Sequence, residues 1–75
     1  MFEEIKALLV EEMSIDEDEI KADAEFINDL GFNSLEVADL VSICEEKYDV
    51  DIEEDKIRQI QTVGEFVEYM ESLVG

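Results

Sequence analysis

The sequence predicts an all-α fold: a small four-helix bundle with three longer helices, one short helix, and a long loop between the first and second helices. Three observations predict it. Apolar residues recur at helical spacing in the segments 2–13, 34–48 and 63–74. Capping patterns at Asn33 and Thr62 come directly before the second and third of these segments. The chain has 75 residues, of which 47% are hydrophobic, so we expect residues 1–75 to form one domain with its own core.

The first helix is predicted over residues 2–13. Its apolar positions form a single stripe, and Glu3, Glu4 and Glu11 fall on the opposite, solvent-facing side. The stripe consists of Phe2, Ile5, Leu8, Leu9 and Met13.

Residues 14–33 are predicted to form a long ordered connection. Residues 14–20 are too acidic and too poorly periodic for a long helix, although a short turn held by Ile15 and Ile20 is expected. A connection of this length inside a compact domain is commonly functional. Gly31 permits a backbone conformation that a side chain would resist, just before the next helix. The expected apolar anchors are Phe26, Ile27, Leu30 and Phe32.

The second helix is predicted to begin at Ser34, because Asn33 is a good N-cap and Glu36 completes the capping-box spacing. On a helical wheel of residues 34–48, one arc is apolar and should face the core. A second arc mixes apolar and acidic residues and is suited to docking a partner protein, and Ser34 lies at its edge. The core arc consists of Val37, Leu40, Val41, Cys44 and Tyr48. The second arc consists of Leu35, Ala38, Asp39, Ser42, Glu45 and Glu46.

After residue 48 the sequence predicts a loop, a short helix and a final helix. Residues 48–52 alternate as a strand would, but no second strand exists to pair with them, so they are interpreted as a loop anchored by Val50 and Ile52. Residues 53–60 predict a short helix with Ile57 and Ile60 facing the core. Thr62 and Glu65 form a second capping box, and Gly64 in the first turn is expected to cost little.

Charge restricts the classes of partner. The chain carries 23 Asp and Glu against five Lys and Arg, a net charge of -18, which repels nucleic acid and anionic membrane surfaces and favours basic patches on other proteins. One cysteine and no histidine exclude an internal disulfide framework and a zinc site. No signal peptide or membrane-spanning run is present in the sequence, so a cytoplasmic monomer is expected.

The residues offer little catalytic chemistry, and no catalytic or metal-ligating residue is predicted. Ser34 lacks the Gly-x-Ser-x-Gly spacing of a hydrolase and has no histidine as base. The acidic segments fail as calcium-binding loops at the glycine and final glutamate positions. What remains for Ser34 is the role of an acceptor modified by another protein, at a helix start that tolerates an added phosphate. Cys44, on the core arc, is interpreted as a small buried hydrophobe.

The stretch Asp29-Leu30-Gly31-Phe32-Asn33-Ser34-Leu35-Glu36 is similar to the phosphopantetheine attachment motif of acyl carrier proteins, and the order of helices resembles that family along essentially the whole chain. The resemblance implies that Ser34 receives 4′-phosphopantetheine from coenzyme A through a phosphopantetheinyl transferase. The terminal thiol of that arm would carry acyl groups as thioesters. The departure is Asn33, where the family usually has aspartate, which removes one negative charge beside the serine.

The resemblance also implies where partners and cargo bind. Basic patches on the transferase and on acyl-processing enzymes would contact positions on the second helix, to which the helical wheel adds Ala38 and Ser42. The positions matched by the resemblance are Leu35, Glu36, Asp39, Glu45 and Glu46. An acyl chain could enter among medium-sized core residues, for which ordinary core packing is the alternative. Those residues are Val37, Leu40, Ile57, Ile60 and Phe66.

The sequence therefore predicts a non-catalytic acyl carrier, with fatty acid or related lipid biosynthesis as the expected setting. A specialised carrier of polyketide, aminoacyl or peptidyl intermediates is an alternative with the same chemistry. An unmodified acidic protein-interaction module is the alternative from another class. Intact-mass measurement after incubation with coenzyme A and a transferase distinguishes the carrier from the module.

Overall fold

The computed structural model describes residues 1–74, and that part of the chain is helical with no strand longer than an isolated bridge. Helix α1 spans Phe2–Met13, a 3₁₀ turn η1 spans Glu17–Glu19, and α2 spans Ser34–Tyr48. Helix α3 spans Glu54–Gln59 and α4 spans Val63–Val74. The predicted all-α class, with three longer helices and one short helix, is confirmed, and α3 is one residue shorter at each end than expected.

Both predicted capping boxes form. Asn33 Oδ1 accepts a hydrogen bond from the Glu36 N–H at 2.9 Å, and Glu36 Oε1 accepts one from the Asn33 N–H at 3.3 Å. At the start of α4, Thr62 Oγ1 accepts from the Glu65 N–H at 3.2 Å, and Glu65 Oε1 accepts from the Thr62 N–H at 3.1 Å. Hydrogen bonds from the Gln61 and Thr62 N–H groups hold the pKa of Glu65 below its ordinary value. Local sequence therefore fixes where α2 and α4 begin.

The core collects apolar residues from every long helix and from the connection. Its most deeply buried side chains come from α1, α2 and α4: Ile5, Leu9, Leu40, Cys44, Val63, Phe66 and Met70. The connection adds Ile20, Ala24, Phe26 and Phe32. The ring centroids of Phe26 and Phe66 lie 5.9 Å apart in an edge-to-face arrangement, the geometry that aromatic pairs prefer. The connection is thus part of the core and not a loose loop.

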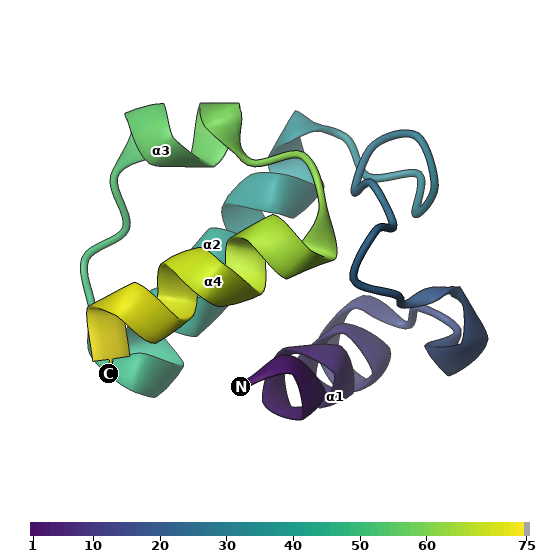
Figure 1. The fold of residues 1–75 in the computed structure, drawn as a ribbon, viewed down its shortest axis with the longest axis horizontal. Coiled ribbons are helices and arrows are strands. Elements are labelled where there is room, and N and C mark those ends of the chain that lie inside the picture. The colour runs from purple at the N-terminus through teal and green to yellow at the C-terminus, as the bar shows by residue number, and fades with distance from the viewer. Residues whose placement is uncertain (75) are drawn as a thin grey trace.

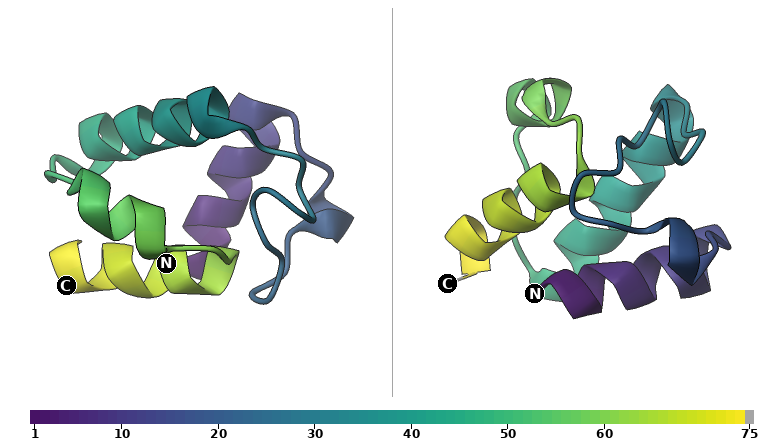
Figure 2. Two further views of the ribbon diagram at one scale, coloured as in Figure 1. Left: turned by 90° about the horizontal axis from the view of Figure 1, so that it is seen from above. Right: turned by 45° about the vertical axis from the view of Figure 1, so that its right-hand side comes forward.

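Helices α1 and α3 lie on opposite sides of the molecule, with α2 and α4 between them (Figure 1). The two further views show the connection wrapping the end of the bundle where α1 stops and α2 begins (Figure 2). Helix α3 contains no fully buried residue. It is held at its start by Glu45 Oε2, which accepts from the Ile52 N–H at 2.9 Å, and by Tyr69 Oη, which accepts from the Glu53 N–H at 3.2 Å.

The connection is joined to the start of α4 by backbone hydrogen bonds. The Gly64 N–H donates to Ala22 O at 2.8 Å, and the Val63 N–H donates to Ala24 O at 3.0 Å. A Cβ on Gly64 would lie 2.8 Å from Ala22 O, closer than side-chain carbons approach a backbone oxygen. The expectation that Gly64 costs little is therefore incomplete: glycine is needed here because two segments distant in sequence approach closely.

Candidate functional site

Ser34 is the first residue of α2, and its side chain is exposed. The chain reaches it through Gly31, whose φ of 71° lies in the left-handed region that glycine adopts without strain, and through the extended Asn33. The capping box then fixes the first turn behind the serine. Ser34 therefore stands at the free N–H end of a helix, where an added phosphate group is favoured by the helix dipole.

The segment before Ser34 is built as a tight turn on buried aromatic anchors. Asp29 Oδ2 accepts a hydrogen bond from the Glu25 N–H at 2.7 Å, and the Phe32 N–H donates to Phe26 O at 2.8 Å. Phe26 and Phe32 are buried, with ring centroids 5.5 Å apart. Asp29 thus has a structural role in the turn before α2, and the position of Ser34 is determined by packing as well as by its own helix.

A groove of about 800 Å³ opens beside Ser34, between α2, α3 and the connection. All five residues predicted to contact an acyl chain line it: Val37, Leu40, Ile57, Ile60 and Phe66. Helical spacing alone did not identify several other lining residues, because they had been assigned to the core, to the loop or to the outer arc. These are Phe26, Ile27, Ala38, Val41, Ser42 and Ile52.

The predicted docking residues of α2 differ in their surroundings. Leu35 is 76% exposed, and Ala38, Asp39, Ser42 and Glu46 are also exposed. Glu36 and Glu45 are half-buried, and both carboxylates accept backbone hydrogen bonds within the protein. Ile27, predicted to be an anchor of the connection, is instead 63% exposed and lines the groove, because Phe26 and Phe32 already fill the core beside it.

The remaining reactive groups are not placed for chemistry. Burial raises the pKa of the Cys44 thiol to about 11, and the side chain has no exposed surface, which confirms it as a buried hydrophobe. Within residues 1–74 no three His, Cys, Asp or Glu side chains come together as a metal site. Over the same residues no helix is long and apolar enough to cross a membrane.

The helical fold, the exposed serine at a helix start and the adjoining apolar groove define a carrier class of protein, in which a serine bears a flexible arm. Comparison with known proteins agrees. The model of the phosphopantetheine attachment site family matches residues 3–70. The chain therefore belongs to the phosphopantetheine attachment family, in the branch of the acyl carrier proteins, and its cofactor is 4′-phosphopantetheine. Members of this branch carry acyl groups and do not catalyse reactions on them.

Individual relatives cover nearly the whole chain. An acyl carrier protein of Sulfurovum sp. (strain NBC37-1) is 38% identical over 73 residues, 97% of each chain. One of Helicobacter hepaticus is 41% identical over 71 residues, 95% of this chain and 93% of its own. The crystal structure of an acyl carrier protein from Thermotoga maritima superposes with a TM-score of 0.81 at 26% identity, covering 93% of this chain and 81% of that one.

Proposed function

We propose that Ser34 is the residue to which 4′-phosphopantetheine is attached, and that residues 1–75 act as one carrier domain in fatty acid or related lipid biosynthesis. The observation that carries this proposal is the exposed Ser34 side chain at the first position of α2, on the rim of the apolar groove. No histidine exists in the chain to activate the hydroxyl, so the base comes from the transferase.

The attachment step is a phosphoryl transfer. The Ser34 oxygen forms a bond to the phosphorus of coenzyme A that bears the pantetheine, and the pyrophosphate bond to that phosphorus breaks. Adenosine 3′,5′-bisphosphate leaves, and the serine proton passes to a base of the transferase. The product is a phosphodiester at the start of α2, where free backbone N–H groups and the dipole favour the anion.

The groove supports a role in sheltering the cargo. Its walls are mainly aliphatic, and an acyl chain attached through the arm to Ser34 would enter at the edge where the arm begins. Withdrawing each methylene from water contributes about 0.8 kcal/mol, so a medium-length chain has a strong drive to enter. Residues Val37, Leu40, Ile57, Ile60 and Phe66 are proposed to contact it.

The partners are proposed to be the transferase and acyl-processing enzymes with basic docking patches, which approach along the outer arc of α2. The net charge of -18 supports this, because opposite charge accelerates encounter. Within that arc the exposed residues Leu35, Asp39 and Glu46 are available for direct contact. Glu36 and Glu45 would contribute mainly through charge, since their carboxylates already accept hydrogen bonds.

Intact-mass measurement tests the attachment site. Wild type, Ser34→Ala and Ser72→Ala are incubated with coenzyme A and a transferase. Ser72 is the control because it is an exposed serine of α4, outside the groove lining and outside the docking arc of α2. Wild type and Ser72→Ala should each gain one phosphopantetheine, and Ser34→Ala should gain none. Gain by Ser34→Ala would move the site, and absence of gain in wild type with several transferases would favour an unmodified interaction module.

A further inference from the structure

Arg58 is the cation of the groove. The chain has five Lys and Arg residues, and within residues 1–74 Arg58 alone among them lines the groove that Ser34 also lines. The other polar groups on its rim are carboxylates, amides and a hydroxyl, from Glu25, Asn28, Ser42, Glu54 and Gln61. A permanently charged, planar hydrogen-bond donor at the edge of an apolar groove can bind acceptor groups of a ligand that enters the groove.

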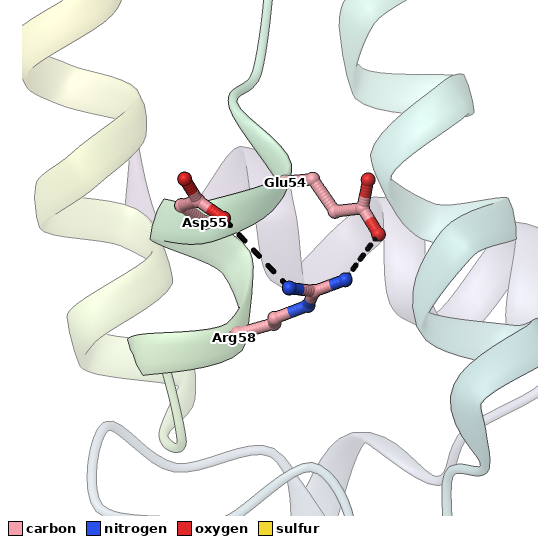
Figure 3. Close-up of polar contacts among 3 residues, drawn as sticks. All are labelled: Glu54, Asp55 and Arg58. Carbon is pink, nitrogen blue, oxygen red and sulfur yellow. Dashed lines mark hydrogen bonds and ion pairs between the residues drawn. The ribbon is translucent and has the colours of Figure 1, made fainter.

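The guanidinium of Arg58 is oriented by its own helix. Its Nη2 donates to Glu54 Oε1 at 2.8 Å, and Nη1 lies 3.8 Å from Asp55 Oδ1. Figure 3 shows the guanidinium in the gap between α3 and α2, with the Glu54 side chain extending toward α2. A guanidinium has five N–H donors, so the single hydrogen bond to Glu54 leaves donors for an acceptor in the groove.

Exchange of partners at Arg58 costs little. The Arg58 side chain is 69% exposed and that of Glu54 is 79% exposed, and ion pairs in such positions contribute little to stability. A guanidinium can therefore keep its contact with Glu54, or release it, while it binds another acceptor.

A loaded arm brings such acceptors to the rim. The phosphopantetheine thioester contains amide carbonyls and a thioester carbonyl between the phosphodiester and the acyl chain. When the acyl chain lies in the apolar interior, the amide carbonyls stay near the rim, because an amide without a hydrogen-bond partner is disfavoured among aliphatic side chains. The phosphodiester itself has the N–H groups at the start of α2.

We propose that Arg58 is a positioning residue of the loaded carrier, and that its free N–H groups donate hydrogen bonds to the amide carbonyl oxygens of the arm while the acyl chain occupies the groove. This role rests on the proposed attachment at Ser34. With its amides held at the rim, the arm keeps the acyl chain and the thioester drawn into the groove, where external nucleophiles reach the thioester less often. The cargo that benefits is an acyl chain long enough to enter the groove.

The test measures thioester cleavage by hydroxylamine, followed by intact mass, on octanoyl-loaded and acetyl-loaded carriers. Octanoyl-loaded Arg58→Ala should be cleaved about two- to tenfold faster than wild type, the factor that one hydrogen bond supplies. Octanoyl-loaded Arg58→Lys should be cleaved at an intermediate rate, because lysine keeps the positive charge and lacks the planar guanidinium with its several N–H donors. The acetyl-loaded proteins should all react alike, since an acetyl group does not reach the interior.

Two matched controls separate positioning from charge and from structure. Lys56→Ala removes the same charge from the same helix at a residue outside the groove lining, and should behave as wild type. Asp55→Asn removes the more distant carboxylate contact of Arg58, 3.8 Å from Nη1, at a residue outside the groove lining, and should retain protection. In parallel, a ¹³C-labelled thioester carbonyl should shift between octanoyl-loaded wild type and Arg58→Ala, and not between wild type and Lys56→Ala.

Equal cleavage of octanoyl-loaded wild type and Arg58→Ala would overturn the role of Arg58 and leave the carrier function intact. The same acceleration in Lys56→Ala or Asp55→Asn would overturn it in favour of a general charge effect of α3. If circular dichroism shows that Arg58→Ala is unfolded, the comparison with Arg58→Lys decides. Failure of wild type to accept phosphopantetheine would overturn both proposals.

Discussion

Replacing Gly64 with alanine should destabilise the protein, although alanine is the better helix former. Within an unobstructed helix this substitution adds about 1 kcal/mol of stability. Here the new Cβ would meet Ala22 O at 2.8 Å and Ala22 Cβ at 3.4 Å. The connection must move away, which costs about 1–3 kcal/mol of overpacking and weakens the 2.8 Å hydrogen bond from the Gly64 N–H to Ala22 O, worth about 0.5–1.5 kcal/mol.

The free energy of unfolding is expected to fall by about 2 kcal/mol in Gly64→Ala, after the gain in helix propensity is subtracted from the two costs. For a domain of this size that loss lowers the melting temperature by about 8–16 °C. Urea unfolding followed by circular dichroism at fixed salt gives the free energy of unfolding directly. Gly31→Ala is the control: no atom lies within 4 Å of its Cβ position, so only its positive φ matters and the loss should be about 1 kcal/mol. Stability of Gly64→Ala at or above wild type would refute the close approach.

Repulsion among the carboxylates should make the stability of the fold depend on salt concentration. The molecule measures 27 × 22 × 19 Å, and the Debye length shortens from about 30 Å at 0.01 M to about 10 Å at 0.1 M salt, so salt screens charges across the molecule. The melting temperature should rise over that interval, and a flat profile would contradict the expectation. Burial and the 3.1 Å hydrogen bond to Glu4 raise the pKa of Tyr48 from 10.0 to about 12. Wild type should therefore have a higher free energy of unfolding than Tyr48→Phe below pH 10, and this difference should vanish as the pH rises through about 12. Paired unfolding curves measure the difference. A pH-independent difference would be inconsistent with that pKa. In the native protein without the arm, Cys44 should react with a colorimetric disulfide reagent only on unfolding. The protein that bears the arm should show one fast-reacting thiol, that of the arm. Fast reaction without the arm would mean that Cys44 is accessible. Asn33→Asp should leave the free energy of unfolding within a few tenths of a kcal/mol of wild type, since the two residues are about equal as N-caps. It should also increase the rate of loading by a transferase at low salt. An unchanged loading rate would show that the transferase does not respond to the added charge.

The features that were predictable from sequence are those set by neighbouring residues. Apolar spacing located α1 and α2 at their observed bounds, and the two capping boxes marked the starts of α2 and α4. Ser34 was singled out because the stretch 29–36 is contiguous, and the family resemblance pointed to the five residues that line the groove; their roles remain predictions.

The features that sequence reasoning missed depend on contacts between distant residues. The need for glycine at position 64 comes from Ala22, and the fixation of α3 comes from Glu45 and Tyr69, which no local pattern indicates. Glu45 was predicted to dock partners from its place on the outer arc and from the family resemblance. Its hydrogen bond from the Ile52 N–H could not be predicted, because it depends on how the loop after α2 folds back. The position of Arg58 on the groove rim was not predicted, since a groove rim exists only after the helices pack.

Ile27 and Leu35 are exposed apolar side chains on a strongly charged protein. Exposed apolar side chains favour contact between surfaces. Each copy carries a net charge of -18, so like-charge repulsion opposes contact between two copies. A cationic surface is attracted instead, so the charge of an approaching surface favours cationic partners at these exposed apolar residues.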